Sequence, residues 1–295
     1  MKTIIIALGG NAILRKGEKP KIKTQIKNIK NACNNLLKII KNNKIIITHG
    51  NGPQAGYLLI QQKAPLDVID AETEGQIGYL IEQELFNLFR KNNMKRGIAT
   101  VLTQVLVNKK DKAFSNPDKF IGPFYSKQEA DKLKEKFKIK KDSNRGWRRV
   151  VPSPKPITII EKEVIKKMSD KKIIVIAAGG GGIPVVNDKG NLKGIEAVID
   201  KDLASACLGN SIKADELIIV TDVDGVYLNY NSKKQKKIRY TNLKEIKKYY
   251  SEGHFPKGNM GPKIEATINF LEKKGKKVII TDINNINKGG TVIVK

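Results

Sequence analysis

Cysteine, long apolar runs and acidic residues are all scarce in this sequence of 295 residues. Its two cysteines, Cys33 and Cys207, lie far apart in apolar helical patterns, which argues against a disulfide or a zinc site. No apolar run approaches the roughly 20 residues that a membrane span needs, and MKTIIIALGGNAI is interrupted too early for a signal peptide. We therefore expect a cytoplasmic globular protein with no membrane partner.

The shortage of acidic residues gives the chain a net charge of +27, with 29 acidic against 56 basic residues. Such an excess can bind the phosphate backbone of nucleic acids. However, only 7 of the basic residues are Arg, and the lysines are spread over nearly every predicted helix. Aromatic residues are only 6%, and no nucleic-acid-binding motif is present. An RNA-binding protein therefore stays a remote alternative, and no specific nucleic-acid partner is expected.

Apolar, mostly β-branched runs recur along the chain and predict its fold class. They lie at residues 3–8, 44–48, 98–107, 172–178, 216–222 and 277–282. Continuous runs of this kind are typical of strands buried on both faces. Helical patterns, such as those over residues 22–40 and 77–88, lie between them. The alternation predicts an α/β protein: a three-layer αβα sandwich with a central, largely parallel open sheet.

One polar segment, from about residue 111 to residue 156, breaks this alternation. It contains several prolines and the only Trp, and it lies between two predicted strands. A structureless connection of that length is unusual in a compact domain. We therefore predict a small inserted subdomain that acts as a lid.

Several predicted strands run directly into small polar loops rich in glycine. These loops are ALGGNA (residues 7–12), THGNGPQAG (48–56), AAGGGGIPV (177–185) and TDVDGVY (221–227). In an open parallel sheet such loops share the edge at the carboxyl ends of the strands, where ligands bind. Glycines let the backbone approach a ligand, and free N–H groups suit phosphate or carboxylate oxygens. None of the loops is a familiar nucleotide-binding fingerprint, so another arrangement must hold any phosphate here.

Two lysines stand in unusual settings. Lys263 follows Pro262, which is expected at the first position of a helix, although a helix N-terminus favours acidic residues. This placement predicts an anion between the helix end and the ammonium group. Lys201 is flanked by Asp200 and Asp202 and lies between apolar AVI and the small residues LASA, which indicates a partly enclosed functional lysine.

These segments occur in the order and spacing of carbamate kinases, members of the amino acid kinase superfamily. The resemblance covers Lys2 to about Asp282 and rests on ALGGNA, THGNGPQAG, AETEGQIGY, NRGWRRVVPSPKP, AAGGGGIPV, VIDKDLASA, TDVDGVYLNY and EGHFPKGNMGPKIEA. GHFPKGNMGPK and GWRRVVPSP separate carbamate kinases from acetylglutamate, aspartate and uridylate kinases. The ending DINNINKGGTVIVK is expected to be shorter than is usual in the family.

The resemblance implies reversible phosphoryl transfer between ATP and carbamate, giving ADP and carbamoyl phosphate, run towards ATP in arginine fermentation. It also implies Mg²⁺ bound with ATP or ADP, and a homodimer. A uridylate or acetylglutamate kinase of the same superfamily is the alternative. Carbamate is already an anion, so no general base is needed. His49 and His254 are accordingly expected to be structural.

The resemblance further implies which residues form the site. Lys119, Lys201, Asp202 and Lys263 would be catalytic, with Lys119 acting from the lid. Carbamate and the transferring phosphoryl group would be bound by Gly9, Gly10, Asn11, Asn51, Gly52, Gly180 and Gly181. Asp222, Tyr227, Met260 and Gly261 would bind the nucleotide, and no residue would bind the metal directly. In this arrangement residues 1–212 of a single domain form a carbamate-binding lobe, and residues 213–295 form a nucleotide-binding lobe.

Overall fold

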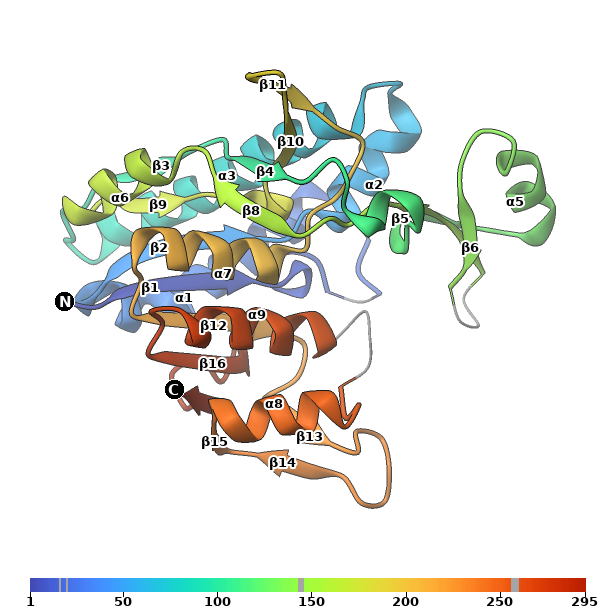
Figure 1. The fold of residues 1–295 in the computed structure, drawn as a ribbon. Helices are drawn as coiled ribbons and strands as arrows, with labels where there is room; N and C mark the ends of the chain where they lie inside the picture. Colours follow the sequence, from blue (N-terminus) through green and yellow to red (C-terminus); the bar gives the residue numbers. More distant parts are fainter. Residues whose placement is uncertain (16, 20, 143–145, 256–259) are drawn as a thin grey trace.

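A computed structural model describes residues 1–15, 17–19, 21–142, 146–255 and 260–295, and an eight-stranded sheet forms its centre (Figure 1). The order across the sheet is β15 (Tyr240–Asn242), β17 (Thr291–Val294), β16 (Lys277–Asp282), β12 (Glu216–Thr221), β1 (Thr3–Leu8), β2 (Lys44–His49), β9 (Ile174–Ile176) and β3 (Ile98–Thr100). All neighbours in this sheet pair in parallel except β16 and β17. The predicted central, largely parallel sheet is confirmed.

The central strands are buried on both faces, as their β-branched runs predicted. In β1, Ile4 and Ile6 point into one apolar cluster, whereas Ile5 and Ala7 point into another. This two-residue alternation follows from the pleat of a strand. The two clusters are therefore the two cores of a layered protein, one on each side of the sheet.

Helices cover both faces of the sheet and complete the three layers (Figure 1). One face carries α1 (Ile22–Asn42) and α3 (Leu66–Lys91), and the other carries α6 (Lys162–Asp170), α7 (Lys201–Ile212), α8 (Leu243–Ser251) and α9 (Met260–Glu272). On α1 the buried residues Ile29, Cys33, Leu36 and Ile40 recur every three or four positions, which gives an apolar stripe along the helix. The αβα sandwich is confirmed.

The prediction of one strand over residues 98–107 is wrong. Its first part is β3, but its second part, β4 (Gln104–Val107), belongs to a separate four-stranded sheet. That sheet has the order β11 (Asn191–Gly194), β10 (Ile183–Asp188), β4 and β8 (Pro156–Ile159). The chain leaves the central sheet after Thr100, and before β4 the backbone N–H of Thr103 donates to buried Glu74 at 3.0 Å. An uninterrupted apolar pattern could not reveal this change of sheet.

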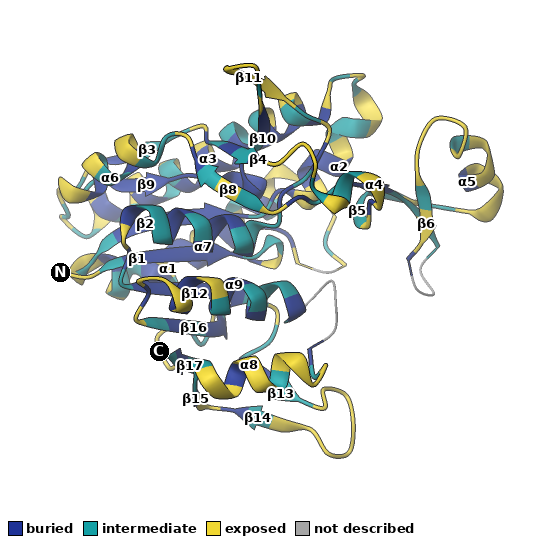
Figure 2. Cartoon of the chain, in the orientation of Figure 1, coloured by how far each residue is buried: buried dark blue, intermediate teal, exposed yellow. Residues whose placement is uncertain are grey.

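The polar insertion forms a small sheet of its own that projects from the main body (Figure 1). Its strands are β5 (Lys119–Tyr125), β7 (Trp147–Val151) and β6 (Ile139–Lys141), with α4 (Lys112–Ser115) before them and α5 (Lys127–Leu133) between β5 and β6. Most of its residues are exposed or half-buried (Figure 2). The last predicted residue of the insertion, Pro156, starts β8 in the main body. The role as a lid stays a prediction.

The remaining elements lie around the carboxyl edge of the central sheet and at the C-terminus. They are η1 (Gly10–Ala12), α2 (Gly52–Gln61), η2 (Gly179–Gly181), and the hairpin of β13 (Val226–Leu228) and β14 (Lys236–Ile238). The C-terminal residues form β17 between β15 and β16. None of the helices in the described residues is long and apolar enough to cross a membrane. The division into two lobes after residue 212 falls between α7 and β12 and stays a prediction.

Candidate active site

The glycine-rich loops meet at the carboxyl edge of the central sheet. The Gly9 N–H donates to the Val220 carbonyl at 3.0 Å, and the Gly50 N–H donates to the Leu8 carbonyl at 3.0 Å. A Cβ atom on Gly50 would lie only 3.1 Å from the Gly10 nitrogen. The loops that follow β1, β2 and β12 are therefore packed backbone against backbone, as glycine permits.

A cavity of about 300 Å³ lies at this edge. The sequence-predicted residues in its wall are Gly10, Asn51, Gly52, Lys119, Gly180, Lys201, Asp202 and Lys263. Three other predicted residues do not line it. Asn11 is exposed on η1, whereas Gly9 and Gly181 are packed so closely that a side chain on either would collide with backbone; their predicted role in binding stays a prediction.

Two lysines and one carboxylate form a buried cluster in the cavity wall. Asp202 Oδ1 accepts a hydrogen bond from Lys201 Nζ at 2.6 Å, and Asp202 Oδ2 accepts one from Lys263 Nζ at 3.1 Å. Lys201 Nζ also donates to the Ala7 carbonyl at 3.3 Å. The N-terminus of α7 holds two of these residues, and Asp200 caps it by accepting from the Asp202 N–H at 2.9 Å. The side chains of Lys201 and Lys263 are only 13% and 15% exposed.

The cluster has one more positive than negative charge, in surroundings that offer little water. Burial, the largest influence, lowers the pKa of Lys201. Burial also opposes the charge on Lys263, but the carboxylates of Asp202, Asp200 and Asp222 raise its pKa. The two ammonium groups outweigh the burial of Asp202 and hold the pKa of that carboxyl below its ordinary value. The uncompensated charge makes this wall a strong site for an anion.

Lys263 Nζ is paired with Asp202, which belongs to another helix, and the anionic ligand that the position of Lys263 predicted stays a prediction. Helix α9 begins at Met260, so Pro262 is its third residue and not its first. Proline is tolerated there because the first N–H groups of a helix have no partner within it. The preceding part of the motif, residues 256–259, lies outside the described residues.

Two cations of the insertion reach the cavity. Lys119 Nζ forms an ion pair with Asp200 at 2.9 Å. Arg148 lines the same cavity, and it donates to the Gly122 carbonyl and to Asp142, each at 3.2 Å. Arg148 is not among the residues that the sequence predicted for the site. Arg148 lies in the motif GWRRVVPSP, which was the one sequence feature that could have pointed to it. No rule of spacing, however, distinguishes Arg148 from its neighbour Arg149.

A buried polar layer supports the loop after β9. Glu74 accepts hydrogen bonds from the Gly179 N–H at 2.8 Å and from the Thr103 N–H at 3.0 Å. Burial raises the pKa of Glu74 to about 8. His49 is fully buried, does not line the cavity, and has a pKa lowered by burial to about 4. Its neutral ring lies so close to Gly179 that a side chain at that position would collide with it.

A second, smaller hollow of about 40 Å³ lies beside the start of α9. Of the residues predicted to bind the nucleotide, Tyr227 and Met260 line it. Asp222 and Gly261 do not; Asp222 is exposed after β12 and accepts a hydrogen bond from Thr221 Oγ1 at 3.1 Å. His254, which was expected to be structural, also lines this hollow. The other residues in its wall are Val223, Gly225, Tyr230 and Phe255.

Within the described ranges, no group of three or more His, Cys, Asp or Glu side chains is arranged to hold a metal ion. Both oxygens of Asp202 in the cavity wall already bind lysines. The expectation that magnesium is held mainly by nucleotide phosphates and water stays a prediction.

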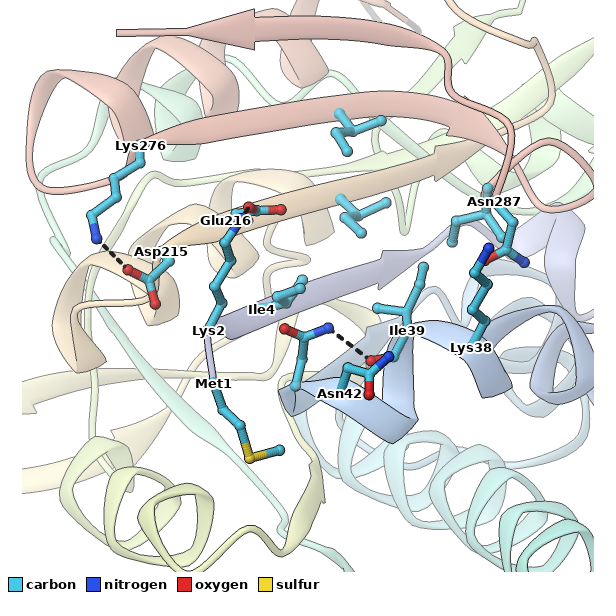
Figure 3. Close-up of a pocket in the computed structure, with 14 residues that line it drawn as sticks. Met1, Lys2, Ile4, Lys38, Ile39, Asn42, Asp215, Glu216, Lys276 and Asn287 are labelled. Carbon is cyan, nitrogen blue, oxygen red and sulfur yellow. Dashed lines mark hydrogen bonds and ion pairs between the residues drawn. The ribbon is translucent and has the colours of Figure 1, made fainter. Parts of the chain in front are cut away.

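A larger hollow of about 700 Å³ lies at the opposite edge of the sheet, where β1 and β12 begin (Figure 3). Four of its charged side chains are already paired: Lys2 with Glu216 and Lys276 with Asp215, each at 2.6 Å. None of the sequence-predicted site residues lines it. Ligands of open parallel sheets bind at the carboxyl edge, so the smaller cavity with the lysine cluster is the candidate active site.

An open parallel sheet of this topology, with an enclosed cationic cluster beside glycine-rich strand ends, defines a class of phosphate-handling enzymes. The sequence profile of the amino acid kinase family matches residues 2–282 of the chain, which is nearly all of it. The profile and the site geometry therefore point to the same class.

Within that class, the chain is similar to carbamate kinases. The carbamate kinase of Thermococcus kodakarensis is 45% identical over all of this chain and all of that protein. The carbamate kinase of Pyrococcus furiosus is 45% identical over 96% of this chain and 94% of that protein. The solved structure of carbamate kinase from Giardia lamblia bound to AMP-PNP has a TM-score of 0.93 and 41% identity, covering 100% of this chain and 98% of that one. The chain belongs to the carbamate kinases of the amino acid kinase family, as its motifs predicted.

Substitutions at two glycines of the predicted site should differ in their effect on thermal stability. A Cβ atom on Gly10 would meet nothing within 4 Å, because it would enter the cavity, so Gly10→Val should leave the melting temperature near that of the parent. It should lower kcat/KM by about 100-fold, since the substrate would be displaced. Gly181 has φ of +103° and no room for a side chain, so the matched Gly181→Val should melt earlier. Thermal melts and saturation kinetics test both, and an active Gly10→Val enzyme with normal saturation would remove Gly10 from the site.

Proposed function

We propose that the chain catalyses reversible phosphoryl transfer between ATP and carbamate, giving ADP and carbamoyl phosphate. The observation that carries the proposal is the buried Lys201–Asp202–Lys263 cluster in the wall of the cavity. The carbamate kinase relatives support the choice of carbamate as the acceptor. The physiological direction, towards ATP in arginine fermentation, and the cytoplasmic location stay predictions from the sequence.

The proposed reaction needs charge stabilisation and positioning. A carbamate oxygen attacks the γ-phosphorus of ATP while the bond from that phosphorus to the oxygen of the ADP leaving group breaks. Lys201 and Lys263 neutralise the charge on the transferring group, and Asp202 fixes both ammonium groups. Carbamate brings no proton that must be removed, so a general base has no task. The low pKa and burial of His49 suit this scheme.

Helix α2 suits the proposed binding of carbamate and phosphoryl oxygens. Its first residue is Gly52, and its N-cap residue, Asn51, does not cap it with a side-chain hydrogen bond. The Asn51 amide instead donates to Asp70 at 3.1 Å and to Thr73 at 2.9 Å. The Gly52 N–H at the start of α2 is left for a ligand, whereas Pro53 has no N–H, and a helix N-terminus favours an anion. Gly10 and Gly180 would contribute backbone on the other sides of the cavity.

The insertion and the C-terminal hollow complete the proposal. Lys119 would leave Asp200 and contact the transferring phosphate when the insertion closes over the substrate. The adenosine group would be bound by the part of the chain around Tyr227 and Met260. Magnesium would enter with ATP or ADP, held by phosphate oxygens and water, and would neutralise part of the phosphate charge.

A homodimer is the proposed assembly, and one face of α3 suits it. Val68, Tyr79 and Phe86 are 42%, 58% and 44% exposed. Val68 and Tyr79 lie about three helical turns apart, and Tyr79 and Phe86 lie about two turns apart, so the three side chains form one stripe along the helix. Leu102, 51% exposed, lies beside this helix near Gly75. A second copy of the chain is the proposed occupant of the stripe, because an isologous interface would bring two such stripes together.

One assay tests the proposed reaction against its alternatives. The chain should form ATP from ADP and carbamoyl phosphate, and it should not phosphorylate uridylate or acetylglutamate. Phosphorylation of either of those acceptors in place of carbamate would show that the chain is a uridylate or acetylglutamate kinase instead. Nanomolar RNA affinity that falls steeply with salt, without kinase activity, would support the nucleic-acid alternative instead.

The lysine at the start of α9 should act on the transition state. Lys263→Ala should lower kcat by about 100-fold with little change in the KM for ADP, because it removes a fixed charge from the transferring group. It should also lower the melting temperature, since Asp202 would keep only one of its two partners. Lys274, exposed just beyond the end of the same helix, offers the matched control Lys274→Ala with parental values. If Lys263→Ala kept the parental turnover, Lys263 would have no role in stabilising the transferring phosphoryl group.

The assembly is tested by a charge on the α3 stripe. Tyr79→Glu should convert a species of twice 32.8 kDa into one of 32.8 kDa, because a buried unpaired carboxylate opposes association. Light scattering after size-exclusion chromatography measures the mass. Tyr240→Glu, at a residue that is 67% exposed on the edge strand β15, is the control and should leave the mass unchanged. An unchanged mass in Tyr79→Glu would place the interface elsewhere.

A further inference from the structure

Asp70 is a buried carboxyl group in the wall of the active-site cavity with one oxygen unused. Its exposed fraction is 1%, and it lies on the first turns of α3. Its Oδ1 accepts a hydrogen bond from the Asn51 amide at 3.1 Å, whereas its Oδ2 is buried and has no hydrogen-bond partner among the described residues. Asn51 is the N-cap residue of α2, where the acceptor is proposed to bind. A polar atom left over in such a wall is available to a ligand.

The surroundings of Asp70 favour its uncharged form. Its hydrogen-bond donor, Asn51, is neutral, and a buried carboxylate without a cation is costly. The described cations of the cavity wall have carboxylate partners of their own. These pairs are Lys119 with Asp200, Arg148 with Asp142, and Lys201 and Lys263 with Asp202.

The nearby titratable groups act in the same sense. Burial, the largest influence, raises the pKa of Asp70 well above its ordinary value, although the Asn51 hydrogen bond opposes it. Glu74 and Asp67 on the same helix, and Glu196 from the segment before α7, raise it further. In the uncharged form Oδ1 is the carbonyl oxygen that accepts from Asn51, so Oδ2 carries the proton and becomes a donor.

We propose that uncharged Asp70 binds the phosphoryl acceptor, donating its Oδ2–H to one oxygen of carbamate or to the carbonyl oxygen of carbamoyl phosphate. This contact orients the acceptor, because it engages one carboxylate oxygen and leaves the other to attack phosphorus. It also makes binding depend on protonation, because an ionised Asp70 has no donor and repels an anionic substrate. The inference rests on the proposed carbamate kinase activity and assigns to it a specificity-determining residue.

The test compares two substitutions in the ATP-forming direction, with carbamoyl phosphate as the varied substrate. Asp70→Asn keeps the acceptor at Oδ1 and an uncharged donor at the other position, so its KM at neutral pH should stay within about threefold of the parent. Asp70→Ala should raise that KM by about tenfold, with a smaller effect on kcat, because it removes a hydrogen bond to the carbonyl oxygen of carbamoyl phosphate.

The pH profile separates binding from a structural role. As pH rises through the folded-state pKa, the parent should lose its donor and its KM for carbamoyl phosphate should rise, whereas Asp70→Asn should show no such alkaline rise. Glu72→Gln, at an exposed acid on the same helix that neither lines the cavity nor contributes to the pKa of Asp70, should behave like the parent. The inference is overturned if Asp70→Asn raises KM as much as Asp70→Ala, or if the alkaline rise persists in Asp70→Asn. If Asp70→Ala does not fold, the Asp70→Asn profile still decides.

The same measurements distinguish a failure of the proposed function from a failure of the inference about Asp70. A parent enzyme that forms no ATP from carbamoyl phosphate would contradict the proposed function itself. An active parent whose KM is indifferent to Asp70 would contradict only the inference.

Discussion

The shared carboxylate of Asp202 determines how the rest of the site is arranged. It joins α7, which carries Lys201, to α9, which carries Lys263, and Lys201 in turn reaches the end of β1 at Ala7. Two ammonium groups could not remain this close and this buried without it, because like charges repel strongly where water is excluded. One excess positive charge remains, and the cavity presents that charge to an anionic ligand. The same contact therefore links the packing of two helices to the chemistry proposed for the site.

The space in which this charge acts exists because glycines bring the strand-end loops together. Gly50 packs on Gly10, and Gly179 packs on the ring of His49. Beneath the second contact, Glu74 binds the backbone of the loop after β9 from inside the core. Such a buried polar layer costs free energy unless its groups are paired. Glu74 is paired at both oxygens, whereas Asp70, one helical turn earlier, is paired at only one. Glu74 therefore supports the loop after β9, whereas Asp70 has one oxygen available to the proposed ligand.

The motifs anticipated most of the cavity wall but not all of it. Lys201, Asp202 and Lys263 were expected in the site and do line the cavity. Gly9 and Gly181, in similar glycine-rich loops, do not line it and instead pack closely against the backbone of Val220 and Ile199. Arg148 and Asp70 line the cavity from segments whose sequence pattern gives no sign of direction. A motif identifies which residues cluster, whereas the direction of each side chain depends on elements remote in sequence.

The sequence by itself determined the class of fold, because β-branched runs buried on both faces and helical stripes between them leave few alternatives to a parallel sheet with two covering layers. It also determined which family the chain belongs to, and it predicted which strand ends carry the candidate site. Only the tertiary structure decided that residues 98–107 divide between two sheets, since an apolar run is equally suited to either. It also decided that Lys263 is paired with Asp202. Charged residues far apart in the chain come into contact because the helices that carry them pack together, and the local sequence around each residue does not predict which partner it meets.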